Sequence, residues 1–135
     1  MSVIQSKRDE AETEFLIKAR ELQAFTIQKC VSAIPKRYTF FLAQNIAQLA
    51  ANVFICVKSA NSIYPTNPHE VQMRRDYFIK ANTNLQSLVS QVELANEIIG
   101  FEGKVMEQWS ALMYAEARLI SGIMKKDRAR YKDIK

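Results

Sequence analysis

Basic side chains are the residues of this chain whose types and grouping could do chemistry. Lysine and arginine number 19 against 14 acidic residues, and the net charge is +5. They gather at Lys36 and Arg37, at Arg74 and Arg75, and in residues 125–135, where six basic residues outnumber two aspartates. Grouped cations neutralise phosphates, so this pattern favours a polyanionic partner.

The predicted binding site consists of basic residues near the ends of helices. They are Lys36, Arg37, Arg74, Arg75, Lys125, Lys126, Arg128 and Arg130. In an antiparallel bundle, the two arginines of the second pair share one end with the C-terminal cluster, whereas the first pair lies at the other end. Arginine suits phosphate because its planar fork donates parallel hydrogen bonds. The alternative is that these residues are solvated helix ends that offset the helix dipole.

Groupings that could support catalysis or hold a metal ion are missing from the sequence. His69 is the single histidine, no two cysteines have zinc-site spacing, and three glycines leave no phosphate-binding loop. A di-iron bundle needs Glu-x-x-His, but Thr66 stands three residues before His69. Glu93, Glu97 and Glu116 are interpreted as carboxylates on helix surfaces. We therefore expect a protein that is not an enzyme and that needs no metal or cofactor.

Hydrophobic periodicity predicts that four helices position the basic residues, at about 8–34, 38–64, 68–99 and 104–130. Asn67 is expected to cap the third helix, with Pro68 in its first turn and Glu70 three residues after the cap. Short connections between long helices give antiparallel neighbours. The 135 residues are therefore predicted to form a single all-α domain, an up-down-up-down four-helix bundle that ends in a basic tail at 125–135.

The second predicted helix is apolar nearly all round. Residues 38–64 contain one charged side chain, Lys58, and neither proline nor glycine. One protomer of this size cannot cover such a helix on every side, so other copies of the chain are expected to pack against it. Its length would also allow a membrane span. A stripe of uncharged polar residues disfavours that interpretation and suits either a seam between packed helices or a surface that lines a water-filled lumen. The stripe consists of Gln44, Gln48, Asn52, Ser59 and Ser62.

The two cysteines bear on the cellular compartment. Cys30 and Cys56 both lie within apolar helical stretches. The N-terminus shows no secretory signal, so we interpret both as reduced packing residues of a cytoplasmic protein. A disulfide between them is the alternative.

Two long segments resemble a known family of small helical proteins. Residues 21–54, ELQAFTIQKCVSAIPKRYTFFLAQNIAQLAANVF, have its apolar first helix, its basic corner from Pro35 to Tyr38 and its long second helix. Residues 73–98, MRRDYFIKANTNLQSLVSQVELANEI, have its basic pair, aromatic pair and leucine seam. Over about residues 14–128 the chain is similar to proteins related to Avd, the accessory variability determinant of diversity-generating retroelements. That wider group includes the intervening-sequence proteins of ribosomal RNA genes.

The resemblance implies an assembly and two kinds of partner. It implies a homopentameric barrel of four-helix bundles that binds nucleic acid and associates with a retroelement reverse transcriptase, supporting mutagenic copying of a template RNA. The basic positions that match the family are Lys36, Arg37, Arg74 and Arg75, and the C-terminal cluster matches in character. Contacts with the RNA or DNA backbone are expected to be independent of sequence. The alternative is an oligomeric helical scaffold with no nucleic-acid role.

Overall fold

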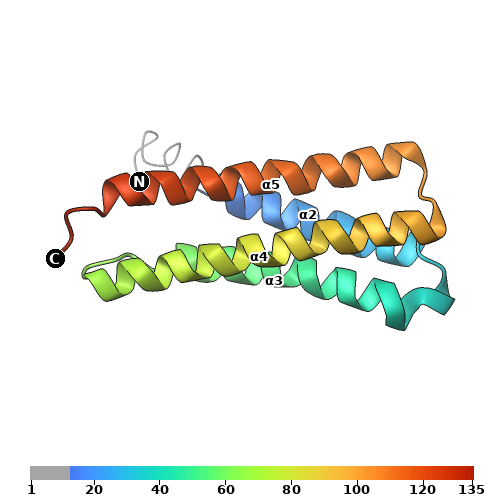
Figure 1. The fold of residues 1–135 in the computed structure, drawn as a ribbon, viewed down its shortest axis with the longest axis horizontal. Coiled ribbons are helices and arrows are strands. Elements are labelled where there is room, and N and C mark those ends of the chain that lie inside the picture. Colours follow the sequence, from blue (N-terminus) through green and yellow to red (C-terminus); the bar gives the residue numbers. More distant parts are fainter. Residues whose placement is uncertain (1–12) are drawn as a thin grey trace, which may run out of the picture.

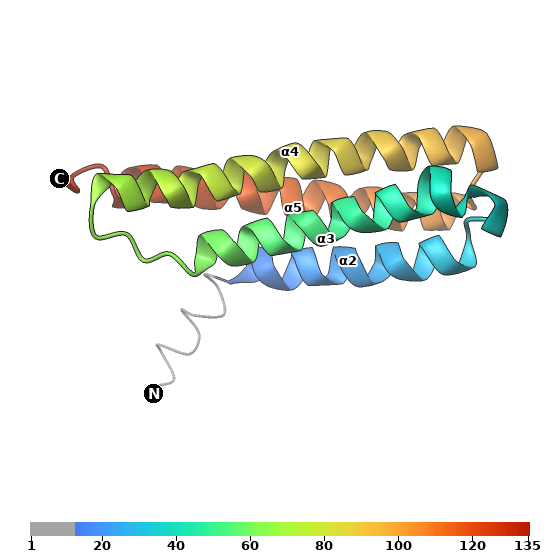
Figure 2. The same ribbon diagram turned by 90° about the horizontal axis from the view of Figure 1, so that it is seen from below.

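Residues 13–135, which the computed structural model describes, form four long helices and no strand. These helices are α2 (Glu14–Ser32), α3 (Gln44–Asn61), α4 (Pro68–Ile99) and α5 (Gly103–Arg130). They lie along one long axis with alternating chain direction (Figure 1). The α2–α3 and α4–α5 connections share one end of the molecule, and the α3–α4 connection shares the other with the C-terminus (Figure 2). The predicted all-α fold and the four-helix bundle are confirmed.

Helix α4 begins and ends where local signals predicted. The Asn67 side chain accepts a hydrogen bond from the backbone N–H of Glu70 at 2.9 Å, and Pro68 occupies the first turn. The Glu70 carboxylate bonds to the backbone N–H and hydroxyl of Thr66, one residue before the predicted capping-box partner. Gly100 ends the helix at φ 78°, a left-handed conformation that glycine adopts without steric cost.

The other helices depart from their predicted limits by a few residues. Helix α2 ends at Ser32 and is described from Glu14, so the predicted helical residues 8–12 lie outside the described part of the chain. Helix α5 begins one residue before the predicted position. Helix α3 ends at Asn61 rather than at residue 64.

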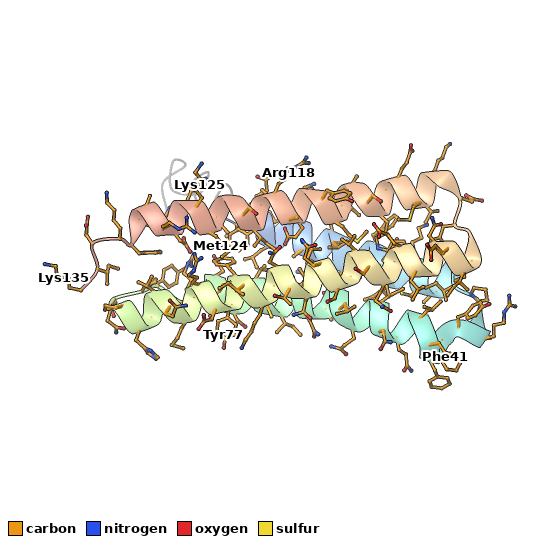
Figure 3. All side chains as sticks on the ribbon, in the orientation of Figure 1. Phe41, Tyr77, Arg118, Met124, Lys125 and Lys135 are labelled. Atoms are coloured by element: carbon orange, nitrogen blue, oxygen red, sulfur yellow. The ribbon has the colours of Figure 1, made fainter. Side chains whose placement is uncertain are left out.

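The corner before α3 corrects the prediction of one regular α-helix over 38–64. Lys36–Tyr38 form a 3₁₀ turn, and Thr39–Ala43 form a π-helical turn in which the N–H of Gln44 bonds to the carbonyl of Thr39. A π turn accommodates one extra residue. The wider turn brings Leu42 and Ala43 into the core and leaves Phe40 and Phe41 exposed at 76% each. Figure 3 shows Phe41 pointing away from the bundle.

Each helix contributes one apolar stripe to a shared core. On α4 the buried residues recur every three or four positions, as bundle packing requires. They are Phe78, Ala81, Leu85, Leu88, Val92 and Ala95. Near the corner end, the indole N–H of Trp109 on α5 donates to the Thr26 hydroxyl on α2 at 3.0 Å, and both side chains are fully buried. This hydrogen bond fixes the register between α2 and α5.

The uncharged polar stripe of α3 lies partly at a helix–helix seam, which is the first of its two predicted surroundings. Gln48 donates to Asn52 at 2.8 Å, and Asn52 donates to Asn84 of α4 at 3.2 Å. Within residues 13–135, Lys36–Asn61 is the one helical segment long and apolar enough to cross a membrane, and a third of its most apolar window is buried. Core helices of soluble proteins meet the same criterion, so this is weak support for a membrane span. Much of α3 nevertheless lacks cover within the protomer.

Candidate nucleic-acid interface

The predicted binding residue Arg74 is buried and fully engaged inside the bundle. Its side chain is 6% exposed, and its Nε and Nη2 atoms donate to the two carboxylate oxygens of Asp127 at 2.6 and 3.2 Å. Its Nη1 atom donates to the carbonyls of Ala60 and Ile63, both at 3.2 Å. Arg74, Asp127 and these two carbonyls are called the Arg74 clamp below. The clamp joins the end of α3, the first turns of α4 and the last turns of α5.

The clamp corrects the expectation that Arg74 is an exposed phosphate ligand. A guanidinium that already donates four hydrogen bonds in a buried position has little left to offer a phosphate. In the sequence, Asp127 stands out only as one of two acids in a basic tail. Its role depends on a contact between residues 53 positions apart, and no local sequence signal reveals such a contact. The predicted common end for the two segments is confirmed.

The other predicted binding residues at this end lie closer to solvent than Arg74. Arg75 is half-buried, whereas Lys125, Lys126, Arg128 and Arg130 are exposed on the last turns of α5. Figure 3 shows Lys125 pointing outward from α5, while its neighbour Met124 points toward α4. Five of the eight predicted residues are therefore gathered around the clamp, four of them exposed and one half-buried.

A pocket of about 300 Å³ lies beside the clamp, between the first turns of α4 and the C-terminal end of α5. Its apolar surface comes from Val71, Met124 and the ring of Tyr131, and cations surround it. The complete lining, called the Tyr131 pocket below, is Val71, Arg75, Met124, Asp127, Arg128, Tyr131 and Lys132. Sequence reasoning missed this pocket and the place of Lys132 in it, because α4 and α5 contribute its walls from distant segments.

Lys36 and Arg37 lie at the opposite end of the molecule. Both are exposed, and the Arg37 guanidinium lies 5.0 Å from the centroid of the Tyr38 ring. Because the 32 residues of α4 span about 48 Å, the corner pair and the clamp end form two separate basic patches on one protomer. The structure brings together the second and third groups of predicted residues and leaves the first apart.

Glu116 on α5 contradicts its interpretation as a surface carboxylate. Its side chain is 0% exposed, and neither carboxylate oxygen has a hydrogen-bond partner. Burial raises the pKa of Glu116 from its ordinary value of 4.5 to about 9, because no neighbouring charge or donor compensates for lost water. The spacing of Trp109, Met113, Glu116, Ile120 and Ile123 on α5 would have predicted its burial. Glu93 and Glu97 are exposed, as expected.

Sites for other chemistry can be surveyed only in the described part of the chain. Within residues 13–135, no three His, Cys, Asp or Glu residues are grouped so that they could hold a metal ion. Cys30 and Cys56 are free thiols rather than a disulfide. Burial raises the pKa of the Cys30 thiol to about 11, and this thiol contacts the Ala43 carbonyl oxygen at 3.5 Å. A thiol with so high a pKa is a poor nucleophile, which agrees with a packing role.

The arrangement places a group of cations at one end of the bundle, with an apolar pocket beside them, and this combination is chemically suited to anions. Comparisons with protein-family models, with curated proteins and with solved structures find no match to this chain.

Proposed function

We propose that this protein is a non-catalytic accessory protein that binds the phosphate backbone of RNA or DNA, assembles as a homo-oligomer and supports a reverse transcriptase. One observation carries the binding part of the proposal, namely the grouping of five cations around the Arg74 clamp. They are Arg75, Lys125, Lys126, Arg128 and Arg130. Contacts of this kind neutralise phosphates without reading bases, so affinity depends steeply on salt and little on sequence.

The clamp supports this role because it holds the cations in place. Asp127 lies between Lys126 and Arg128 and is fixed by two hydrogen bonds to Arg74. The last turns of α5 are thereby tied to the bundle. Cations on a fixed helix lose less conformational entropy on binding than cations on a flexible tail.

The test is binding of a fluorescently labelled structured RNA at several salt concentrations. We expect the wild-type affinity to fall steeply with salt, and Lys125→Glu/Lys126→Glu to flatten the log–log slope by about two, near one unit for each phosphate that is no longer neutralised. Lys36→Glu/Arg37→Glu makes the same charge change at the far end and serves as the matched control. If only the control variant weakens binding, the corner patch carries the contact. Absence of wild-type binding at about 50 mM salt would exclude the nucleic-acid role.

The assembly part rests on an uncharged outer face. Helix α3 carries no charge before Lys58, and α4 carries none between Lys80 and Glu93. Exposed apolar side chains lie on or beside these stretches, including Phe41 and Ile55. We propose that copies of the chain cover this face in a ring, and the family resemblance favours a pentamer. Light scattering should give several times the protomer mass of 15.5 kDa, and a stable monomer would refute the ring.

The reverse-transcriptase partner is supported by the resemblance of residues 21–54 and 73–98. The direct test is whether a reverse-transcriptase gene and a pair of near-identical repeats lie beside the gene for this protein. Co-purification of the two proteins would then establish the contact. The second candidate function is an oligomeric helical scaffold, which the uncharged face favours and the cation cluster does not require. Salt-dependent RNA binding separates the two functions.

A further inference from the structure

The Tyr131 pocket combines two chemistries that a phosphate-binding surface alone does not need. Its floor is apolar, from Val71, Met124 and Tyr131, and its cations are Arg75, Arg128 and Lys132. Within residues 13–135, none of these three cations forms an ion pair, and the Asp127 carboxylate in the lining is already held by Arg74. The pocket therefore suits an occupant that is flat and apolar in one part and anionic in another.

The geometry points to an unpaired nucleotide as this occupant, with its base in the pocket and its phosphates on the surrounding cations. This inference rests on the proposed nucleic-acid binding and extends it from phosphates to bases. Aromatic and apolar side chains bind bases through stacking, without regard to sequence. A volume of about 300 Å³ suits one base and excludes a stacked base pair with its two strands. The protein would then prefer single strands or unpaired ends to duplexes.

The position of the pocket would allow a bound nucleic-acid strand to continue beyond it along α5. Arg128 belongs to the pocket lining, and Lys125 lies one turn before it on the same helix. Phosphates on either side of a bound base can therefore meet further cations along α5. A paired base cannot reach the pocket, because its apolar faces are covered by its neighbours in the stack.

Backbone hydrogen bonds fix the main chain of Tyr131 beside the pocket. Its N–H donates to the Asp127 carbonyl at 2.9 Å, and its own carbonyl accepts from Ile134 at 3.2 Å. The Arg74 guanidinium lies 5.9 Å from the centroid of its ring. The Arg130 guanidinium lies 6.0 Å from the same centroid, so cation–π contacts with two arginines position the ring.

The experiment compares three labelled ligands with equal numbers of phosphates on the intact protein. These are a single-stranded oligonucleotide, the same sugar–phosphate strand without its bases, and a duplex with the same number of phosphates. We expect the base-bearing strand to bind roughly tenfold more tightly than the abasic strand, as one stacked base contributes. Tyr131→Ala should remove this difference and leave the affinity for the abasic strand unchanged, whereas Tyr131→Phe should retain it.

Tyr114→Ala is the matched control, since Tyr114 is an exposed tyrosine on α5 outside the pocket. The wild-type comparison needs no variant, so the inference stays testable even if Tyr131→Ala disturbs the fold. Equal affinity of the wild type for base-bearing, abasic and duplex ligands would overturn the pocket assignment while leaving phosphate binding intact. If none of the three ligands binds, the proposed function itself fails.

Discussion

Arg74 and Glu116 are both ionisable side chains buried in the same bundle, but their surroundings are opposite in kind. Arg74 has a carboxylate partner and two carbonyl acceptors. Glu116 has no partner, and its pKa rises to about 9 through burial. A buried group stays charged only where other charges and dipoles replace the water it has lost. A buried carboxyl group without such partners, like that of Glu116, keeps its proton and stays neutral.

The surroundings of Glu116 follow from the register of the antiparallel helices. Counting along the antiparallel helices from the Trp109–Thr26 and Arg74–Asp127 contacts puts Glu116 at about the level of Ala19 in α2 and Leu85 in α4. Charged residues near this level of α2 lie toward solvent, where Lys18 and Glu21 pair at 3.1 Å. Helix α4 carries no charge between Lys80 and Glu93. Neither neighbouring helix can therefore compensate a Glu116 carboxylate.

Asp127→Ala should reduce the free energy of unfolding the most, because it removes the charged partner of Arg74. The change leaves the Arg74 guanidinium buried without its counter-charge, and we expect a loss of about 3–5 kcal/mol in the free energy of unfolding. Urea denaturation followed by circular dichroism measures it. Asp133→Ala, at an exposed aspartate six residues further along, is the control and should change stability little. A loss below about 1 kcal/mol for Asp127→Ala would mean that water reaches Arg74.

Glu116→Gln tests the buried carboxyl group that has no hydrogen-bond partner. The folded pKa lies above the ordinary value of 4.5, so the unfolded chain releases this proton first, and the stability of the wild type falls as pH rises from about 4.5 to about 9. The variant cannot titrate and should be more stable by up to about 3 kcal/mol at pH 7, with no difference below pH 4.5. The measurement is the difference in the free energy of unfolding between the wild type and the variant, taken at a series of pH values. An equal change in exposed Glu107→Gln would show that the effect is not specific to burial.

Thr26→Val tests a neutral buried pair against these two charged groups. Valine keeps the shape of threonine but removes the acceptor for the Trp109 indole N–H. An unpaired buried donor should cost about 2 kcal/mol, less than a stranded charge. Thermal unfolding measures the loss. Thr83→Val is the matched control, because Thr83 is exposed and its hydroxyl bonds only to the Ile79 carbonyl on its own helix.

Asn67→Ala should have the smallest effect. Its side chain caps α4 at the surface of the clamp end, where water can replace the hydrogen bond to the Glu70 N–H. We expect a loss of about 1 kcal/mol. Asn82→Ala, in the interior of the same helix, controls for helix propensity and should not destabilise. A loss for Asn67→Ala equal to that of Asp127→Ala would contradict the distinction between solvated and buried polar contacts.

Features encoded within a few residues could be predicted from the sequence, whereas features that depend on distant contacts could not. The limits of α4 follow from Asn67, Pro68 and Gly100, which act locally. The π turn at Thr39–Ala43 depends on how Leu42 and Ala43 pack against other helices, so periodicity alone suggested a regular helix.

The candidate site divides in the same way. Antiparallel topology predicted that Arg74 and Arg75 share an end with the C-terminal cations, and they do. Which of the two adjacent arginines turns inward depends on the rotation of α4 and on Asp127, which is 53 residues away from Arg74. The burial of Glu116 was predictable from its spacing along α5. Assigning a carboxylate to the surface by its residue type was the error.

The Arg74 clamp also determines how the end of α5 moves. Terminal helical turns ordinarily open and close freely, and their amide protons exchange quickly with solvent. Here the contact of Asp127 with Arg74, and the bond from the Tyr131 N–H to the Asp127 carbonyl, restrain that opening. Amide protons near the C-terminal end of α5 should exchange at rates closer to those of the helix centre. Opening this turn past Asp127 would leave the buried Arg74 guanidinium with only the carbonyls of Ala60 and Ile63 as acceptors.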